Sequence, residues 1–130
     1  MGNGKRISIK DARILEQEYV KTRANSLNTI LKKKGLIESE DVRDVWFDLE
    51  ALKDYIAYVE QTAAKKGITK NLGLRVYFGA YPDKQEYEDK RGKATVVFLP
   101  THSSYGSENE NFSDLDGFNW GGGGWPPNGF

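Results

Sequence analysis

The chain has 130 residues, with 19 Lys and Arg against 19 Asp and Glu, and no cysteine. This length suffices for one domain with its own core, and the balanced charge gives no overall field that would favour nucleic acid or a membrane surface. The absence of cysteine excludes disulfides, thiolate catalysis and zinc–cysteine sites. Because residues 1–10 are polar and no apolar run reaches the ~18 residues of a membrane span, we expect a soluble, cytoplasmic protein without a signal peptide.

The first predicted element is a helix that begins after Ser8 and ends at Gly35. Ser8 is a favourable N-cap residue and Gly35 a natural left-handed terminator. Between them, apolar residues recur at helical spacing at Ala12, Leu15, Tyr19, Leu27 and Ile30. Arg23 interrupts this stripe. The helix is rich in Lys and Arg, so it is also a candidate surface for weak nucleic-acid binding.

A short apolar strand at residues 45–47 precedes a second helix, which Asp48 caps and Gly67 ends. The buried face of this helix is expected to carry Leu49, Leu52, Ile56, Val59 and Ala63, widened by Tyr55 and Tyr58.

Two longer strands follow, at residues 74–81 and 94–99, joined by a charged loop. In the first, alternation puts Leu74, Val76, Phe78 and Ala80 on the core face and Arg75, Tyr77, Gly79 and Tyr81 on the other. The second strand is apolar on both faces, which favours a central or covered position, and Pro100 is expected at its end. The sequence therefore predicts an α+β fold with two main helices on a small mixed sheet of three strands or slightly more, in which a right-handed crossover makes residues 45–47 parallel to residues 74–81.

The end of the chain is rich in Gly, Asn and Pro but also carries large aromatic residues. We expect a single α+β domain at residues 1–105 and an aromatic tail at residues 106–130. A loose tail is one interpretation. The preferred one is that the tail docks on the body or on another copy, which would make a homo-oligomer.

The best candidate binding site is formed by Arg75, Tyr77 and Tyr81 on one face of the first long strand, with Trp46, Arg23 and aromatic residues of the tail at its edges. A guanidinium between tyrosines can bind a carboxylate or phosphate while the rings stack on a planar group. The simpler interpretation is a half-exposed face on which the Arg side chain extends to water.

His102 is the single histidine, and it follows the end of a strand. With Asp48 as an acid partner it would suit a small hydrolase or transferase, which is the alternative function. No spaced set of His, Cys or acidic residues predicts a metal site, and no cofactor is expected. The sequence therefore predicts a non-enzymatic binding protein whose partner is an unidentified protein or a small anionic ligand.

Three segments resemble small uncharacterised proteins of Bacteroidetes-type bacteria: Val45-Trp46-Phe47-Asp48-Leu49-Glu50, Gly73-Leu74-Arg75-Val76-Tyr77-Phe78-Gly79-Ala80-Tyr81-Pro82 and Thr95-Val96-Val97-Phe98-Leu99-Pro100-Thr101. The resemblance spans about residues 8–102. It implies a bacterial origin and no activity, ligand or catalytic residue.

Overall fold

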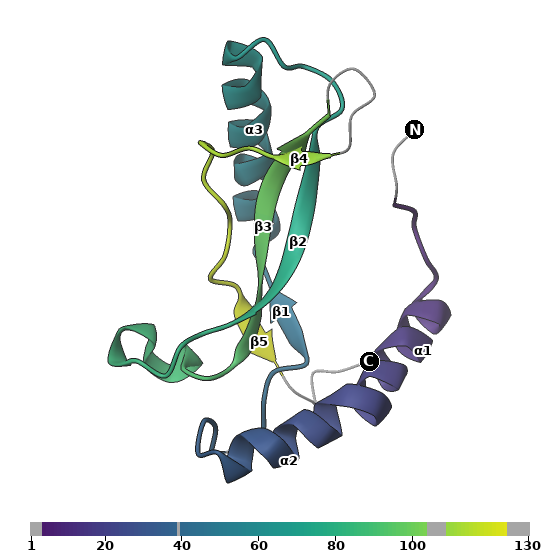
Figure 1. Cartoon of the computed structure of the whole chain (residues 1–130). Helices are drawn as coiled ribbons and strands as arrows, with labels where there is room; N and C mark the ends of the chain where they lie inside the picture. Colours follow the sequence, from purple (N-terminus) through teal and green to yellow (C-terminus); the bar gives the residue numbers. More distant parts are fainter. Residues whose placement is uncertain (1–3, 39, 104–108, 125–130) are drawn as a thin grey trace. The chain divides into compact units, whose positions relative to one another are not determined.

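The computed structural model describes residues 4–38, 40–103 and 109–124 (Figure 1). The chain divides into two compact units: unit 1 is Met1–Val45, Ala80–Ala94 and Gly123–Phe130, and unit 2 is Trp46–Gly79 and Thr95–Gly122. The predicted division at residues 105 and 106 follows a different boundary and stays a prediction. In the part of the chain that the structure describes, no helix is long and apolar enough to cross a membrane.

Unit 2 is built on a three-stranded sheet with the order β2-β3-β4. The strands are β2 (Gly73–Ala80), β3 (Ala94–His102) and β4 (Glu110–Asn111). The helix α3, Leu49–Lys65, lies against this sheet and supplies the core residues Tyr55, Val59 and Ala63 (Figure 1). The predicted α+β class and three-stranded sheet are confirmed, and β3 holds the central position that its apolar faces favour.

The helix α3 begins and ends where the sequence predicts. Asp48 caps it, because its side chain accepts a hydrogen bond from the Ala51 N–H at 2.9 Å. Gly67 follows the last turn with a φ of +80°, a left-handed conformation that glycine adopts at little cost.

The buried face of α3 is turned toward its tyrosines relative to the prediction. The Tyr55 hydroxyl donates to the Asp116 carbonyl at 2.8 Å, and the Tyr58 hydroxyl accepts from the Asp116 N–H at 2.9 Å. These bonds hold the C-terminal segment against the tyrosine side of the helix. As a result Leu49 and Ile56, which were predicted to be buried, are 69% and 39% exposed.

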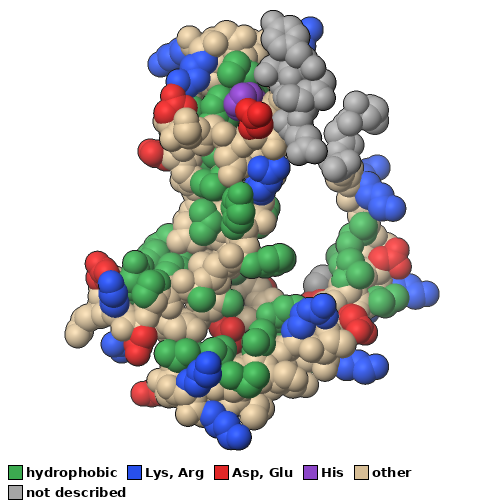
Figure 2. Space-filling view, in the orientation of Figure 1, with side chains coloured by type: hydrophobic (Ala, Val, Ile, Leu, Met, Phe, Trp, Pro, Cys, Tyr) green, Lys and Arg blue, Asp and Glu red, His purple; other side chains and the backbone are tan. Residues whose placement is uncertain are grey.

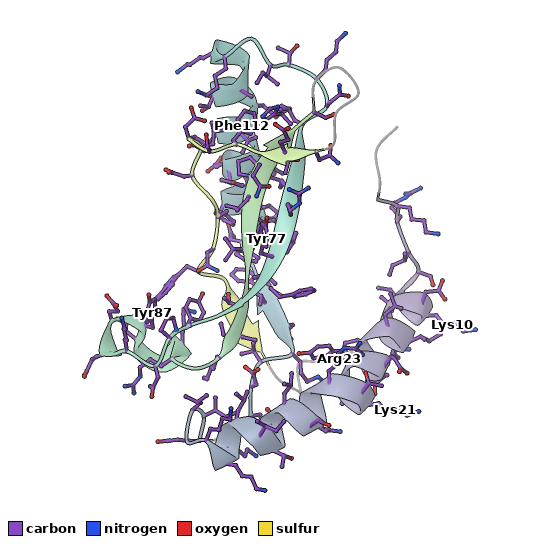
Figure 3. All side chains as sticks on the ribbon, viewed as in Figure 1. Lys10, Lys21, Arg23, Tyr77, Tyr87 and Phe112 are labelled. Carbon is purple, nitrogen blue, oxygen red and sulfur yellow. The ribbon has the colours of Figure 1, made fainter. Side chains whose placement is uncertain are left out.

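The described part of the C-terminal segment runs along the edge of β3 that does not pair with β2. Phe98 and Phe118 form an antiparallel bridge with two N–H···O bonds of 2.9 Å. Phe112, labelled in Figure 3, and Leu115 are buried in one cluster with Tyr55, Val59 and Ala63 of α3. Phe112, Leu115 and Phe118 therefore form part of the core of unit 2, whereas Trp120 is 51% exposed. Two other aromatic residues of the predicted tail, Trp125 and Phe130, lie outside the described residues.

The strand β1, Asp44–Trp46, does not join the three-stranded sheet. It pairs with β5, Gly122–Gly124, in a separate two-stranded sheet. The predicted crossover that would make residues 45–47 parallel to residues 74–81 in one mixed sheet is therefore wrong. A glycine run carries no apolar alternation, so the sequence pattern gave no sign of β5.

The strand β3 continues through Pro100 instead of ending there. Pro100 is fully buried, and its carbonyl accepts the Phe112 N–H at 3.0 Å. A proline lacks only the N–H donor, so it can still accept a hydrogen bond from the neighbouring segment.

Unit 1 contains a long helical segment with a wide turn in its middle. Its parts are α1 (Ile9–Tyr19), a π-helical turn η1 (Val20–Ala24) and α2 (Asn25–Lys33). The π-turn holds one residue more than an α-turn, so the partly buried Tyr19 is followed by the buried Ala24 and then the buried Asn28. Arg23, which interrupts the apolar stripe in the sequence, is thereby exposed.

Both predicted ends of this helical segment are confirmed. The Ser8 side chain accepts a hydrogen bond from the Asp11 N–H at 3.0 Å. Gly35 lies beyond the last turn with a φ of +71°.

A buried polar network joins α2 to the segment after it. Asn28 Nδ2 donates to Glu40 Oε2 at 2.7 Å, and Asn28 Oδ1 accepts the Asp41 N–H at 2.7 Å. The buried Asp41 carboxylate in turn accepts the Ala94 N–H at 2.8 Å. One asparagine and one aspartate thus satisfy backbone groups that would otherwise be buried without partners.

Unit 1 also contains a partly buried ion pair. The Arg43 guanidinium binds the Glu16 carboxylate through two hydrogen bonds of 2.9 and 2.5 Å, and the two side chains are 9% and 17% exposed. Burial raises the pKa of Tyr19, and the nearby Asp41 charge adds to this shift while Arg23 opposes it.

Candidate functional site: a polar cluster on the sheet

A chain of hydrogen bonds links β2 to β4 on one face of the sheet. Arg75 Nη1 donates to Asn111 Oδ1 at 2.7 Å, and Arg75 Nη2 donates to the Asn109 carbonyl at 3.0 Å. Asn111 Nδ2 then donates to the Tyr77 hydroxyl at 2.9 Å. We call Arg75, Tyr77, Asn109 and Asn111 the Arg75 cluster.

Strand geometry brings these side chains together. Arg75 and Tyr77 are two residues apart on β2, so they point to the same side of the sheet. Asn111 pairs with Thr101 in the antiparallel β3–β4 ladder. This pairing places Asn111 on the Arg75 side, opposite to the α3 side on which Phe112 is buried.

The charge of Arg75 is not neutralised within the cluster. Both of its partners are neutral amide oxygens, and Arg75 forms no ion pair with the described residues. Two N–H donors are engaged, which fixes the guanidinium plane and leaves its other donors for a ligand. The Tyr77 hydroxyl accepts from Asn111, so its own hydrogen remains available for donation. The site can therefore offer one positive charge and several oriented donors to an anion.

The other predicted members of this site lie elsewhere. Tyr81 lies beyond the end of β2, where it is buried and its ring is 5.8 Å from that of Tyr87. Arg23 is exposed on η1 and donates to the adjacent Thr22 hydroxyl at 2.6 Å. Tyr81 and Arg23 both belong to unit 1, so their part in the site stays a prediction. Trp46 is in unit 2 and is 67% exposed.

His102 and Asp48 lie at opposite ends of α3. Asp48 caps the first turn of the helix, whereas His102 is next to Ser103, whose carbonyl accepts from Asn71 in the loop after the helix. A helix of 17 residues is ~25 Å long. His102 instead packs on the Phe112 ring at 4.5 Å, and its Nδ1 is buried without a hydrogen-bond partner among the described residues.

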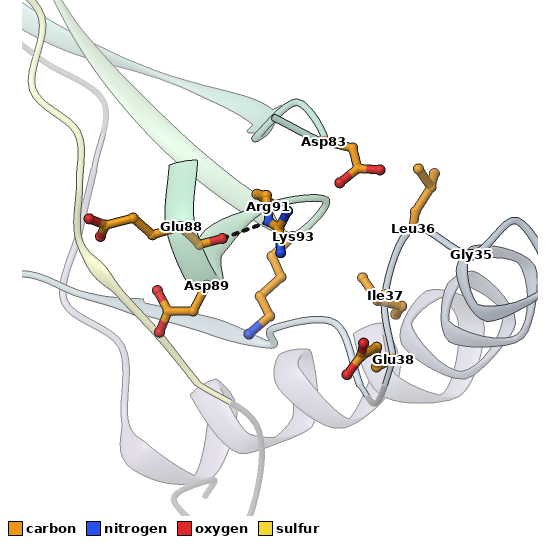
Figure 4. A pocket seen from close by; sticks show the side chains of 9 residues that line it. All are labelled: Gly35, Leu36, Ile37, Glu38, Asp83, Glu88, Asp89, Arg91 and Lys93. Carbon is orange, nitrogen blue, oxygen red and sulfur yellow. Dashed lines mark hydrogen bonds between the residues drawn. The ribbon is translucent and has the colours of Figure 1, made fainter. Parts of the chain in front are cut away.

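Unit 1 contains a separate pocket of about 370 Å³ (Figure 4). Its lining residues are Gly35, Leu36, Ile37, Glu38, Asp83, Glu88, Asp89, Arg91 and Lys93. The backbone of Gly92 lies close to the Leu36 carbonyl oxygen, since a Cβ added at Gly92 would overlap that atom. Arg91 Nε donates to the Glu88 carbonyl at 3.0 Å. Four acidic side chains, Glu38, Asp83, Glu88 and Asp89, and two basic ones, Arg91 and Lys93, line this pocket, so it presents both signs of charge to a ligand.

Two further sequence predictions concern metals and nucleic acid. Within the described ranges, no group of His, Cys, Asp or Glu side chains could hold a metal ion. Lys10 and Lys21 extend outward from the helical segment of unit 1 (Figure 3). Acidic side chains lie among the basic ones on this surface (Figure 2), so nucleic-acid binding by this helix stays a prediction.

The sequence patterns did not predict the two asparagines that complete the Arg75 cluster. Asn109 and Asn111 lie in a Glu/Asn run whose composition is typical of a loop. The asparagines at every second position were the one available signal, and two strand residues are too few to show a period.

The fold and the cluster together define an α+β protein with a cationic, hydrogen-bonding site on one face of its three-stranded sheet. The chain matches no protein-family model, no curated protein and no solved structure. The function is therefore argued from the site itself.

Proposed function

We propose that this protein is a non-enzymatic binding protein whose Arg75 cluster recognises a carboxylate or phosphate group. The observation that carries the proposal is the fixed guanidinium of Arg75, which forms no ion pair with the described residues. Asn111 and Asn109 orient it at 2.7 and 3.0 Å without cancelling its charge. A preoriented guanidinium loses little side-chain freedom when it binds an anion by paired hydrogen bonds.

The neighbouring groups fit the same ligand. Tyr77 is 42% exposed, so its ring and hydroxyl can both contact a bound molecule. No histidine, serine or carboxylate is among the side chains that form these hydrogen bonds. A site of this composition supports binding by charge and stacking.

Thermal shift with sodium phosphate and sodium acetate, against sodium chloride at equal ionic strength, tests the proposal. At about one hundred times Kd, a ligand that binds only the folded state stabilises it by about 2.7 kcal/mol. We expect phosphate or acetate to raise the melting temperature of the wild type by several degrees. The Arg75→Gln variant should lose this shift.

The matched control is Arg91→Gln, which removes an exposed arginine from unit 1. It should keep the full anion-dependent shift. The proposal fails if neither anion produces a shift that depends on Arg75, or if both variants lose it equally, since the latter would indicate non-specific charge binding.

We also propose that binding takes place in the cytoplasm of a Bacteroidetes-type bacterium. The support is the sequence resemblance over about residues 8–102 together with the polar composition of the chain. Fractionation of such a bacterium with an antibody against this chain tests the location, and signal in the periplasmic fraction alone would contradict it.

A further inference from the structure

The strand β2 forms an edge of the three-stranded sheet (Figure 1). It has eight residues, whereas β4 at the opposite edge has two. Among the described residues, no strand pairs with the outer side of β2. A long edge presents a row of backbone N–H and C=O groups that can pair with another strand.

This edge lacks the features that usually prevent such pairing. Residues 73–80 contain no proline and no lysine, which are common protections of exposed edges. The one charged residue, Arg75, is held over the sheet face by Asn111 and Asn109.

The middle of β2 is also unusually apolar for a surface. Val76, Tyr77 and Phe78 are 47%, 42% and 93% exposed. Val76 and Phe78 lie on the α3 side of the strand, where Leu74 is packed against the core. The apolar row of β2 therefore continues beyond the part that α3 covers.

We propose that β2 pairs in antiparallel fashion with β2 of a second copy, so that the two sheets form one continuous sheet across a two-fold axis. The axis passes through Tyr77. In this register Val76 faces the second copy's Phe78, and Arg75 faces the second copy's Gly79. Aromatic and β-branched residues form favourable cross-strand pairs, and glycine leaves room for the arginine without opposing its charge.

Neighbouring registers are less favourable. An axis through Arg75 sets two like charges against each other, which destabilises a strand pair. An axis through Val76 sets Phe78 against Leu74, which is already packed in its own core. In the register through Tyr77, Val76 of each copy faces Phe78 of the other, so these two exposed apolar side chains on the α3 side of β2 meet in two symmetric pairs. This self-complementarity identifies a second copy as the partner of the β2 edge.

This inference does not rest on the proposed anion function. The apolar contacts of Val76 and Phe78 lie on the α3 side of β2, opposite the Arg75 cluster, although the axis also brings Tyr77 of the cluster beside its equivalent in the second copy. Loss of dimerisation and loss of anion binding can therefore be observed separately.

Light scattering with size-exclusion chromatography on the full chain tests the proposal. We expect the wild type to have twice the 14.7 kDa mass of a single chain. Phe78→Lys should give the single-chain mass, because it sets a charged side chain against Val76 of the second copy in both cross-strand pairs. Ile14→Lys, a change at a 58% exposed residue of unit 1, should leave the dimer intact.

Thermal unfolding shows whether each variant is folded. Phe78 is 93% exposed, so Phe78→Lys should keep a cooperative melt. A wild type of single-chain mass, or a dimer that persists in a folded Phe78→Lys variant, overturns the proposal. The latter would place the interface elsewhere.

Cross-linking tests the register. The chain has no cysteine, so Tyr77→Cys places one thiol beside its equivalent across the axis. Under mild oxidation Tyr77→Cys should form a disulfide-linked dimer at least tenfold faster than Ile14→Cys. Equal rates for the two variants would overturn the proposed axis.

Discussion

At the scale of single residues, Tyr55 ties α3 to the end of the chain through one hydroxyl. That hydroxyl donates to the Asp116 carbonyl at 2.8 Å. Burial, together with the neighbouring Tyr58 and the negative charge of Asp116, raises the pKa of Tyr55 to about 12. The folded state therefore holds the neutral phenol, whereas tyrosine in an unfolded chain ionises near pH ~10.

The stability supplied by neutral Tyr55 is complete below pH ~10 and is lost as the pH rises toward about 12. Tyr55→Phe should cost about 1 kcal/mol at pH ~8, because a hydrogen bond is lost. The unfolding free energy of Tyr55→Phe should also fall less steeply with pH over the alkaline range. Urea unfolding at several pH values measures both effects.

The control for this experiment is Tyr77→Phe, which removes a 42% exposed phenol from the same unit. Its stability should fall with pH as steeply as that of the wild type. If the stability of Tyr55→Phe also falls with pH as steeply as that of the wild type, ionisation of Tyr55 does not cause the loss of stability at alkaline pH.

Residue-level predictions succeeded where the physical cause is local. Ser8 and Asp48 cap helices through bonds to residues three positions later, and Gly35 has the positive φ that a left-handed terminator requires. Arg75 and Tyr77 were identified from alternation along one strand. Asn111 was not, because its role depends on partners on a strand far away in the sequence.

At the scale of elements, the π-turn η1 sets which side of the first helical segment faces inward. It adds one residue between Tyr19 and Ala24, so both stay on the inner side. The interruption of the apolar stripe by Arg23 was visible in the sequence. The π-turn that causes this interruption could not be predicted, because a wide turn depends on the contacts of both flanking helices.

Deletion of Arg23 should convert η1 to a regular α-helix, because Tyr19 and Ala24 then lie one α-turn apart. We expect a change of less than about 1 kcal/mol in unfolding free energy, since only an exposed residue is removed. Thermal and urea unfolding measure this effect.

Deletion of Ser26, an exposed residue of α2, is the matched control. It turns the preceding part of the helix by ~100° relative to Asn28, which must remain bonded to Asp41. It should cost more than about 2 kcal/mol, because buried packing or a buried hydrogen bond is lost. Equal losses for the two deletions would contradict the role of the π-turn.

At the scale of the whole molecule, the core of unit 2 needs residues from the middle and from the end of the sequence. Leu115 and Phe112 are buried with Tyr55, Val59 and Ala63. The fold class could be predicted from helix and strand periodicity. The partner of β1 could not, because the glycines of β5 pair through their backbone alone.

Two leucine substitutions test the contribution of the C-terminal segment. Leu115 is 7% exposed and Leu15 is 64% exposed. Leu115→Ala should lower the unfolding free energy by about 2–5 kcal/mol, as expected for a buried leucine. Leu15→Ala should change it by less than about 0.5 kcal/mol. If both changes have similar small effects, the segment does not contribute to the core.

The position of Phe112, Leu115 and Phe118 late in the sequence also determines when the protein can fold. During synthesis α3, β2 and β3 leave the ribosome before the residues that cover them. Until Phe118 has emerged, the Tyr55 side of α3 is open to water and to other nascent chains, a state that favours aggregation. Translation speed and chaperone binding over the last part of the message should therefore affect the yield of folded protein.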